Sequence, residues 1–406
     1  MGQVRKQGEQ FETYIVADHR GQLLSVGADS GAVDAFGRAR VSEPFTLFDS
    51  ALRYDKGSEK WNEIIASSGT SVHLPNESSV AMTVTASGDS VLRRTKRNFP
   101  YLPGKSLLVY QSFVGAPLQN GLIQEVGYFN NQNGIICRAS GTTMQFVVRS
   151  FASGSVVENV VNQDQWNLDT AEWLDFSKAN IFTTDLEWLG VGRVRVGFVR
   201  DGEFYYCHEF NHAGQIDSVY MTSATLPLSY RIAATAAVSG ATMKQICSSV
   251  MSEAGYEPSG PIYSISPSIA AIPNTSGERI VAGIRMASGR TDNVIIPTKI
   301  DLVTESATTI EWKLRRNPTV SGFTWAASNN GRGNVEVTSS GSIVSGGTIV
   351  NSGLFSSAGS LDVATPAGLA FSLGTNADGS SEELFLTVTS SGNAKATGML
   401  GWQEFL

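Results

Sequence analysis

The sequence has few features that would cross-link the chain or insert it into a membrane. Its 406 residues include only three cysteines, Cys137, Cys207 and Cys247, and no Cys-x-x-Cys pair, which excludes a disulfide framework and a four-cysteine zinc site. No run approaches the roughly 18 apolar residues of a membrane helix. The first ten residues lack the apolar core of a secretory signal. We therefore expect a soluble protein that is made inside a cell.

Charge is also scarce, and its balance is acidic. Only 17% of the residues are charged, and 30 Lys and Arg face 37 Asp and Glu, for a net charge of −7. This balance argues against a generally basic nucleic-acid-binding protein. The 41 glycines, with so little charge, are typical of a β-protein with many turns rather than of long helices.

Residues 1–75 show no sustained period of either helix or strand. Their apolar side chains are scattered among polar and glycine-rich stretches, so the segment has no evident core of its own. We expect an extended arm that lies over a neighbouring domain or another protein chain.

Residues 76–256 show the two-residue period of half-buried strands at short spacing, which favours a β-sandwich or jelly roll. The clearest hairpin joins 191–200 to 203–210 through Asp201-Gly202, a pair suited to a type I′ turn. Residues 241–254 fit either a helix or a strand.

Glycines and prolines then mark a boundary, and we expect a linker over 257–275. Residues 276–406 again read as short strands and predict a second β-sandwich. We expect its last two strands, 383–389 and 394–404, to pair with each other.

Residues 208–212, His-Glu-Phe-Asn-His, match the zinc-protease pattern H-E-x-x-H. That chemistry requires a helix, on which the two histidines share one face. Here the run follows an Asp-Gly turn and alternating aromatics, so we expect a strand, along which four residues span about 13 Å. We predict no metal site and no cofactor.

Asp185 and Glu187 are spaced like same-face neighbours on a strand, and a retaining glycosidase needs two carboxyls about 5 Å apart. The E-x-D-x-x-E run of such enzymes on this kind of fold is absent, as are the common hydrolase and nucleotide-binding motifs. We therefore expect no enzyme, and a polysaccharide depolymerase built on these two acids is the minor alternative.

Three tryptophans, Trp166, Trp173 and Trp188, offer stacking surfaces for sugars or partner proteins, although core packing is the more common role of such residues. The single concentrated basic stretch is residues 93–97, Arg-Arg-Thr-Lys-Arg. Strand alternation places Arg93 and Arg97 opposite Arg94 and Lys96, so we expect a solvated strand and no nucleic-acid contact. An electrostatic match to an acidic protein remains an alternative.

Residues 34–50, DAFGRARVSEPFTLFDS, resemble the "DAFGRLRVSxPxTLFDS" stretch of a family of tailed-bacteriophage virion proteins. The resemblance continues through FPYLPGKS at 99–106, LEWLGVGRVR at 186–195 and LPLSY at 226–230. It covers residues 34–256 strongly and the C-terminal domain weakly. Ala39 stands where the family commonly has leucine.

The resemblance implies an all-β virion structural protein with a concanavalin- or laminin-G-like jelly roll, and it brings no catalytic residues. We expect a tail-associated, self-assembling protein, such as a tail fibre or other tail-attached component, made in the host bacterial cytoplasm. Its partners would be other virion proteins (tail, portal-proximal or capsid) and further copies of itself. The alternatives are a head decoration protein and a module that binds host surface polysaccharide. The assembly contacts would come from the arm: Asp34, Phe36, Arg38, Arg40, Phe45 and Phe48.

Overall fold

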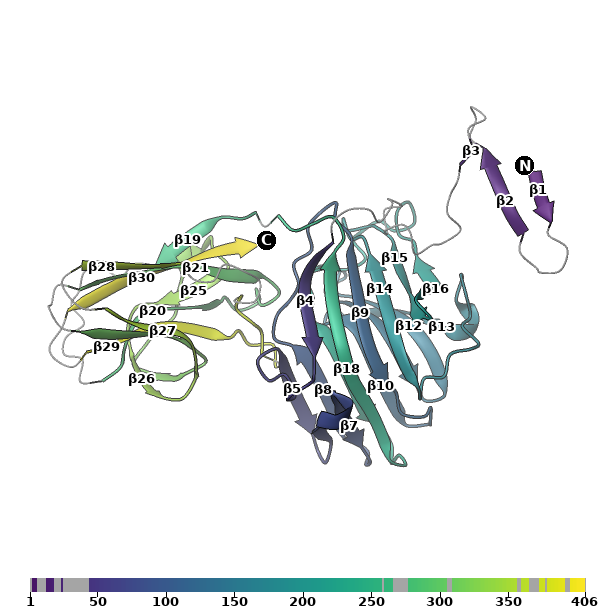
Figure 1. The fold of residues 1–406 in the computed structure, drawn as a ribbon, viewed down its shortest axis with the longest axis horizontal. Helices are drawn as coiled ribbons and strands as arrows, with labels where there is room; N and C mark the ends of the chain where they lie inside the picture. The colour runs from purple at the N-terminus through teal and green to yellow at the C-terminus, as the bar shows by residue number, and fades with distance from the viewer. Residues whose placement is uncertain are drawn as a thin grey trace.

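The computed structural model describes residues 2–5, 12–17, 23–24, 44–257, 259–265, 277–304, 309–355, 359–364, 372–376, 378–390 and 395–405. Across these residues the protein is all β, with three short 3₁₀ turns (Pro75–Glu77, Gln163–Gln165 and Ser328–Gly331) and no α-helix. Two sandwiches lie side by side (Figure 1). The predicted fold class, all-β with two sandwiches, is confirmed.

The first sandwich is built from two antiparallel sheets, between which the chain crosses repeatedly as in a jelly roll. Sheet I has the order β13-β12-β11-β10-β17-β8-β5: β13 (Val157–Asn162), β12 (Thr143–Ser150), β11 (Gly134–Ser140), β10 (Leu122–Phe129), β17 (Leu228–Ala234), β8 (Ser90–Thr95) and β5 (Trp61–Ala66). Sheet II has the order β16-β15-β14-β9-β18-β7-β6, with β4 also on β18: β16 (Glu203–Phe210), β15 (Val194–Arg200), β14 (Ala179–Leu186), β9 (Leu107–Val114), β18 (Ala241–Ser252), β7 (Ser79–Val84), β6 (Thr70–Leu74) and β4 (Phe45–Ala51).

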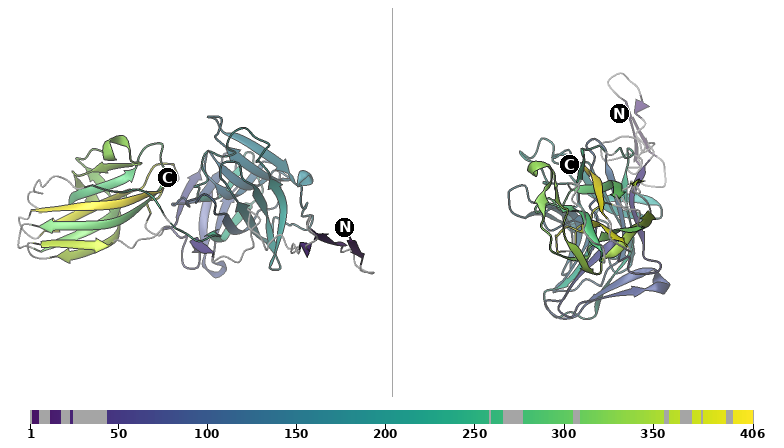
Figure 2. Two further views of the ribbon diagram at one scale, coloured as in Figure 1. Left: turned by 90° about the horizontal axis from the view of Figure 1, so that it is seen from above. Right: turned by 90° about the vertical axis from the view of Figure 1, so that its left-hand side faces the viewer.

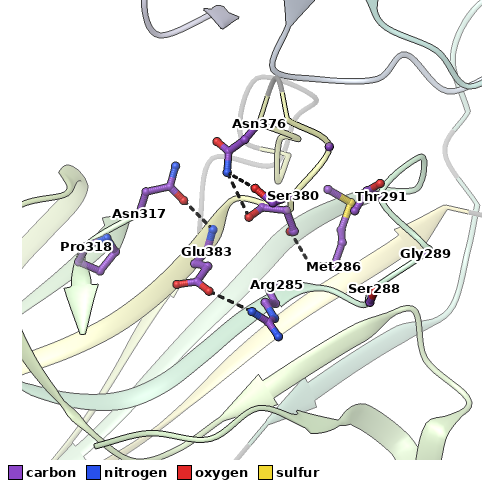
Figure 3. A pocket seen from close by; sticks show the side chains of 12 residues that line it. Arg285, Met286, Ser288, Gly289, Thr291, Asn317, Pro318, Asn376, Ser380 and Glu383 are labelled. Atoms are coloured by element: carbon purple, nitrogen blue, oxygen red, sulfur yellow. Dashed lines mark hydrogen bonds and ion pairs between the residues drawn. The ribbon is translucent and has the colours of Figure 1, made fainter. Parts of the chain in front are cut away.

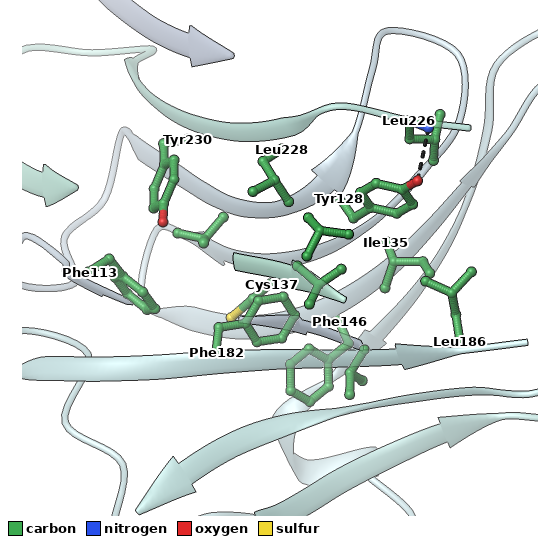
Figure 4. Close-up of a cluster of buried hydrophobic side chains, with 14 of the residues drawn as sticks. Phe113, Tyr128, Ile135, Cys137, Phe146, Phe182, Leu186, Leu226, Leu228 and Tyr230 are labelled. Atoms are coloured by element: carbon green, nitrogen blue, oxygen red, sulfur yellow. Dashed lines mark hydrogen bonds between the residues drawn. The ribbon is translucent and has the colours of Figure 1, made fainter. Parts of the chain in front are cut away.

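The inner faces of the two sheets enclose one large apolar core (Figure 4). Phe113 and Phe182 from sheet II meet Phe146 and Tyr230 from sheet I, and all four side chains are fully buried. Tyr128 is buried as well, and its hydroxyl accepts a hydrogen bond from Leu226 N at 3.0 Å. A buried hydroxyl without a partner would cost free energy, so this bond fixes how the 224–228 segment crosses the core.

The sandwich begins earlier in the chain than the sequence indicates. Strand β4 pairs with β18, β5 with β8, and β6 with β7, so residues 45–74 belong to the two sheets. Leu47, Phe48 and Trp61 are buried in the core. The predicted arm boundary at residue 75 is therefore wrong, because these apolar side chains are covered by strands that lie far away in sequence.

Local predictions inside the first sandwich agree closely with the strands. Residues 203–210 form β16 and pair with β15, and both Asp201 and Gly202 have positive φ, as a type I′ turn requires. The ambiguous run 241–254 forms the longest strand of the sandwich, β18, with alternating buried positions.

A separate three-stranded sheet precedes the first sandwich. It contains β1 (Gly2–Arg5), β2 (Glu12–Ala17) and β3 (Leu23–Leu24), in the order β1-β2-β3. This sheet lies apart from both sandwiches (Figure 1). Viewed from above, it lies at one end of the long axis and the second sandwich at the other (Figure 2).

The second sandwich packs a four-stranded sheet III against an eight-stranded sheet IV. Sheet III has the order β19-β30-β21-β28: β19 (Ile262–Ile265), β30 (Ala396–Phe405), β21 (Val294–Thr304) and β28 (Gly359–Ala364). Sheet IV contains β23 (Thr319–Ser321), β26 (Ser342–Ser345), β20 (Arg279–Met286), β29 (Glu383–Ser390), β22 (Ile310–Arg316) and β27 (Thr348–Phe355), with β25 (Val335–Thr338) on β20 and β24 (Ala326–Ala327) on β25.

Two expectations about this second sandwich are wrong. Strand β19 lies within the predicted linker 257–275 and pairs with β30, so the sandwich begins by residue 262. The last two strands do not pair with each other, because β29 joins β20 and β22 in sheet IV whereas β30 joins β21 and β19 in sheet III. They follow each other in sequence but face each other across the core.

The two sandwiches are joined through direct contacts. Thr375 N donates to Lys96 O at 2.5 Å, and the side-chain amides of Asn62 and Asn98 donate to Thr375 O and Thr291 O. Three side chains from sheet III extend the first core into the junction: Val294, Ile296 and Phe405. These contacts give the junction both a polar and an apolar component.

A fully buried carboxylate, that of Glu382, sits at this junction. Gly374 N donates to it at 2.9 Å, Arg316 Nε lies 3.6 Å away, and Lys96 Nζ of the first sandwich lies 3.9 Å away. A buried charge is stable only when opposite charges and donors surround it. The carboxylate therefore links one basic group from each sandwich.

We predict that Glu382→Gln lowers the free energy of unfolding by roughly 3 kcal/mol, because it leaves Arg316 and Lys96 without their buried counter-charge. Urea denaturation followed by tryptophan fluorescence measures the change. The control is Glu311→Gln, whose carboxylate pairs with Lys313 at 2.9 Å and is 43% exposed, and it should change stability by less than about 0.5 kcal/mol. Equal effects of the two substitutions would contradict a special role for Glu382.

Candidate binding surfaces

The first three residues of the H-E-x-x-H run, 208–210, lie on a strand as predicted, but the last two lie beyond it. His208 is in β16, and His212 follows the end of that strand. His208 Nδ1 accepts a hydrogen bond from Asn167 N at 3.2 Å, whereas His212 Nδ1 donates to Gly192 O at 2.7 Å. Each ring is therefore held by a different backbone segment. Within the described ranges, no group of three His, Cys, Asp or Glu side chains is arranged to hold a metal.

Asp185 and Glu187 do not form a pair of same-face strand neighbours, because β14 ends at Leu186 and Glu187 lies beyond it. Asp185 is fully buried, and it accepts bonds from Arg195 Nη2 and from the Tyr206 hydroxyl at 2.8 Å. Glu187 Oε1 accepts from Arg193 N at 2.9 Å. The two carboxylates thus have separate structural partners and do not resemble an acid and a nucleophile that share one substrate.

The three tryptophans take part in packing and do not form one surface. Trp166 is buried and stacks on Phe146 with ring centroids 4.1 Å apart. Trp173 is half-buried, 5.5 Å from Tyr205, and the Arg200 guanidinium lies 5.0 Å from its ring. Trp188 follows the end of β14, and its indole Nε1 donates to Met221 O at 3.1 Å.

The basic stretch is buried at residues 93–95 and half-buried at Lys96 and Arg97, so the prediction of a solvated strand is wrong. Arg93 bonds Glu63 and donates to Gln245 Oε1 at 2.6 Å, while Arg94 donates to Ser229 Oγ at 3.1 Å. Burial lowers the pKa of both guanidiniums to about 10. Lys96 belongs to the junction with Glu382. Arg93 and Arg94 therefore make their contacts within the fold.

Of the expected assembly residues, only Phe45 and Phe48 lie in the described part of the chain, and Asp34, Phe36, Arg38 and Arg40 lie outside it. Both phenylalanines are in β4. Phe48 is buried 4.9 Å from Phe99, whereas Phe45 is exposed and stacks on Tyr256 at 5.1 Å. Phe48 is therefore a core residue, and Phe45 is accessible at the surface.

An apolar groove of about 580 Å³ crosses the outer face of sheet II. Tyr110 of β9 and Phe204 of β16 are half-buried there, with ring centroids 5.9 Å apart. Ile181 and Val199 line the same groove, whose rim includes serines of β18. Sequence reasoning missed this site because Tyr110 and Phe204 come from separate strands. The only local signal was the alternation of Phe204 with Tyr206.

A second, polar pocket of about 640 Å³ lies in the second sandwich, where three turns meet (Figure 3). Its polar groups bond mainly to one another. Arg285 pairs with Glu383 at 3.3 Å, Asn317 Oδ1 accepts from Glu383 N at 2.8 Å, and Asn376 Nδ2 donates to Ser380 Oγ at 3.0 Å. These bonds hold the turns together and explain the polar lining without a ligand.

The comparisons with known proteins add only distant likenesses. No family model matches the chain, and no curated protein sequence matches it. Among solved structures, a glycosyl hydrolase family protein from Mycobacterium fortuitum is 10% identical, with a TM-score of 0.39 over 51% of this chain and 99% of that one. The CBM2 module of the evolved Dit of Lactobacillus casei BL23 phage J-1 is 9% identical, with a TM-score of 0.35 over 53% and 99%. The receptor binding domain of botulinum neurotoxin D is 9% identical, with a TM-score of 0.33 over 51% of this chain and 49% of that one.

Within the described residues, no helix is both long and apolar enough to span a membrane.

The two histidines predict a pH dependence of stability. Burial lowers the pKa of both His208 and His212 in the folded protein, whereas in the unfolded chain both titrate near about 6.5. The unfolded state therefore binds protons first as pH falls, so the contribution of the two rings is complete above about pH 7 and is lost progressively as the pH falls from about 6.5 to the lower pKa of the folded state.

Urea denaturation between pH 7.5 and 5 should show stability falling more steeply in the native chain than in the double variant His208→Gln/His212→Gln. Identical slopes would contradict the assignment of this dependence to the two buried rings.

Zinc added at pH 7.5 should leave the midpoint of thermal unfolding unchanged, since the two rings have separate partners.

Proposed function

We propose that this protein is a structural component of a tailed-phage virion, tail-associated, and attached through its N-terminal segment. The observation that carries the proposal is the N-terminal sheet, which stands apart from both sandwiches (Figure 1). Its strands have only four, six and two residues. So small a sheet is marginally stable by itself, so it needs a partner surface.

Two further features support this assignment. The first is the resemblance of residues 34–50 to virion proteins, a run whose last six residues belong to β4 in sheet II. The second is the elongated arrangement, with the N-terminal strands and the second sandwich at opposite ends of the long axis (Figure 2). A protein attached at one end in this way would project its second sandwich outward.

Matched deletions test the proposal. Removing residues 1–43 should leave both sandwiches folded, with an unchanged midpoint of thermal unfolding, and should abolish incorporation into purified particles, as measured by mass spectrometry. Removing residues 1–51 also takes away β4, including the buried Leu47 and Phe48, and should destabilise the fold by several kcal/mol, at about 2–5 kcal/mol for each large buried side chain.

The proposal fails if the chain is absent from purified particles, or if the chain lacking residues 1–43 is incorporated normally. Electron micrographs of particles with the chain tagged at its C-terminus distinguish a tail location from head decoration.

A second candidate function, recognition of host surface polysaccharide, is favoured by the groove on sheet II. Half-exposed aromatic rings such as Tyr110 and Phe204 present apolar faces that suit sugar rings. If this function holds, the native chain binds host polysaccharide on a glycan array, and Phe204→Ala abolishes that binding. The control is Tyr54→Ala, which removes an aromatic ring outside the groove that is 83% exposed, and it should leave binding unchanged. An absence of binding by the native chain favours a purely architectural role.

A further inference from the structure

At one end of the first sandwich, the edge strands of the two sheets differ in how they are covered. In sheet II, the edge of β16 is covered by the loop between β13 and β14, because Leu168 N and Asp169 N donate to Cys207 O at 3.0 and 3.1 Å. At the same end, β13 is the outermost strand of sheet I. Within the described residues, no backbone group outside β12 bonds the backbone of Val157–Val160. The edge of sheet II is thus covered at this end, whereas the edge strand of sheet I, β13, is free to pair with another strand.

The direction of the open groups follows from the register of sheet I. In an antiparallel strand, alternate residues direct both backbone groups to the same side. Gly141 N donates to Leu122 O at 2.8 Å, so the even-numbered residues of β10 bond β11. Through the unbroken registers, the even-numbered residues of β12 then bond the odd-numbered residues of β13. Glu158 and Val160 therefore present their N–H and C=O groups outward, where another strand would pair.

An apolar pocket of about 660 Å³ adjoins this edge, at the open end between the two sheets. Val157 and Asn159 form one wall, Ile216 and Val219 form the other, and the stacked rings of His212 and Tyr220 lie between them. Val157 is 54% exposed. The open backbone groups and exposed apolar side chains thus occupy one continuous surface.

The strand also lacks the features that normally block edge pairing. Natural edge strands are protected by lysine, proline, bulges or inward charges. Strand β13, Val-Glu-Asn-Val-Val-Asn, has no lysine or proline, and its register with β12 is unbroken. Its single charge, Glu158, is bound by Arg138 at 2.7 Å and Arg149 at 2.9 Å.

We propose that β13 is the docking site for β13 of a second copy of this chain, paired antiparallel about a two-fold axis perpendicular to sheet I. The charge of the strand is compatible with a second copy as the partner. Glu158 is paired with Arg138 and Arg149 within each copy, so two identical β13 strands can meet without like-charge repulsion. Such an axis places both apolar pockets on the same side of the joined sheet, where their valines face each other. The contact is self-complementary, as a two-fold interface must be. This inference is independent of the proposed virion role.

Sedimentation velocity of the full chain tests it, over concentrations up to about 100 μM. The native chain should show a concentration-dependent monomer–dimer equilibrium, and Val157→Lys should weaken dimerisation at least about tenfold, because it sets two lysines near the axis. The matched control is Val72→Lys, on the edge strand β6 at the other end of the sandwich, where Val72 is 53% exposed. It should dimerise like the native chain.

Hydrogen exchange supplies a second readout that does not depend on any variant. The amides of Glu158 and Val160 should exchange more slowly in the dimer than in the dilute monomer. A native chain that stays monomeric, a Val157→Lys variant that dimerises with unchanged affinity, or a dimer with unprotected Glu158 and Val160 amides would each overturn the proposal. So would an edge that pairs with an added extended peptide but not with a second copy.

Discussion

The arrangement of the two sandwiches depends on the buried carboxylate of Glu382. Because a charge without counter-charges in the interior costs several kcal/mol, Arg316 of the second sandwich and Lys96 of the first must both remain beside it. The same contact holds the segment around Thr375 against Lys96. Phe405 can then complete the first core from the second sandwich. The junction is therefore part of the folded interior rather than a loose connection.

The need to pair buried charges and polar groups also explains how the chemically suggestive side chains are held. Arg93 and Arg94 are tied to neighbouring strands, Asp185 to Arg195, and the histidines to backbone groups. On the outer face of sheet I, the fully buried Glu125 is similarly held by Arg138 and Arg231 at 2.8 and 2.9 Å. Charged side chains in this protein are mostly used to satisfy one another. What remains for partners is the surface: a groove, an open edge and the N-terminal sheet.

Much of the fold could be predicted from the sequence because its signals are local. The two-residue period of β7, the Asp201-Gly202 turn and the strand character of residues 208–210 each depend on a few adjacent residues. Residues 45–74 could not be assigned, because their apolar side chains are irregularly spaced and β4 pairs with β18, some 200 residues later. The false pairing of β29 with β30 has the same origin: adjacency in sequence does not reveal which sheet a strand joins.

The sequence by itself determined the all-β class, the turns and the resemblance to virion proteins, since composition, period and motif are properties of the chain alone. Only the tertiary structure decided which side chains are accessible. It buried Phe48 and Arg93, exposed Phe45, brought Tyr110 beside Phe204, and covered the edge of β16 while leaving that of β13 open. The physical reason is that burial and strand pairing are fixed by contacts between residues far apart in the chain, and those contacts exist only once both sheets have formed.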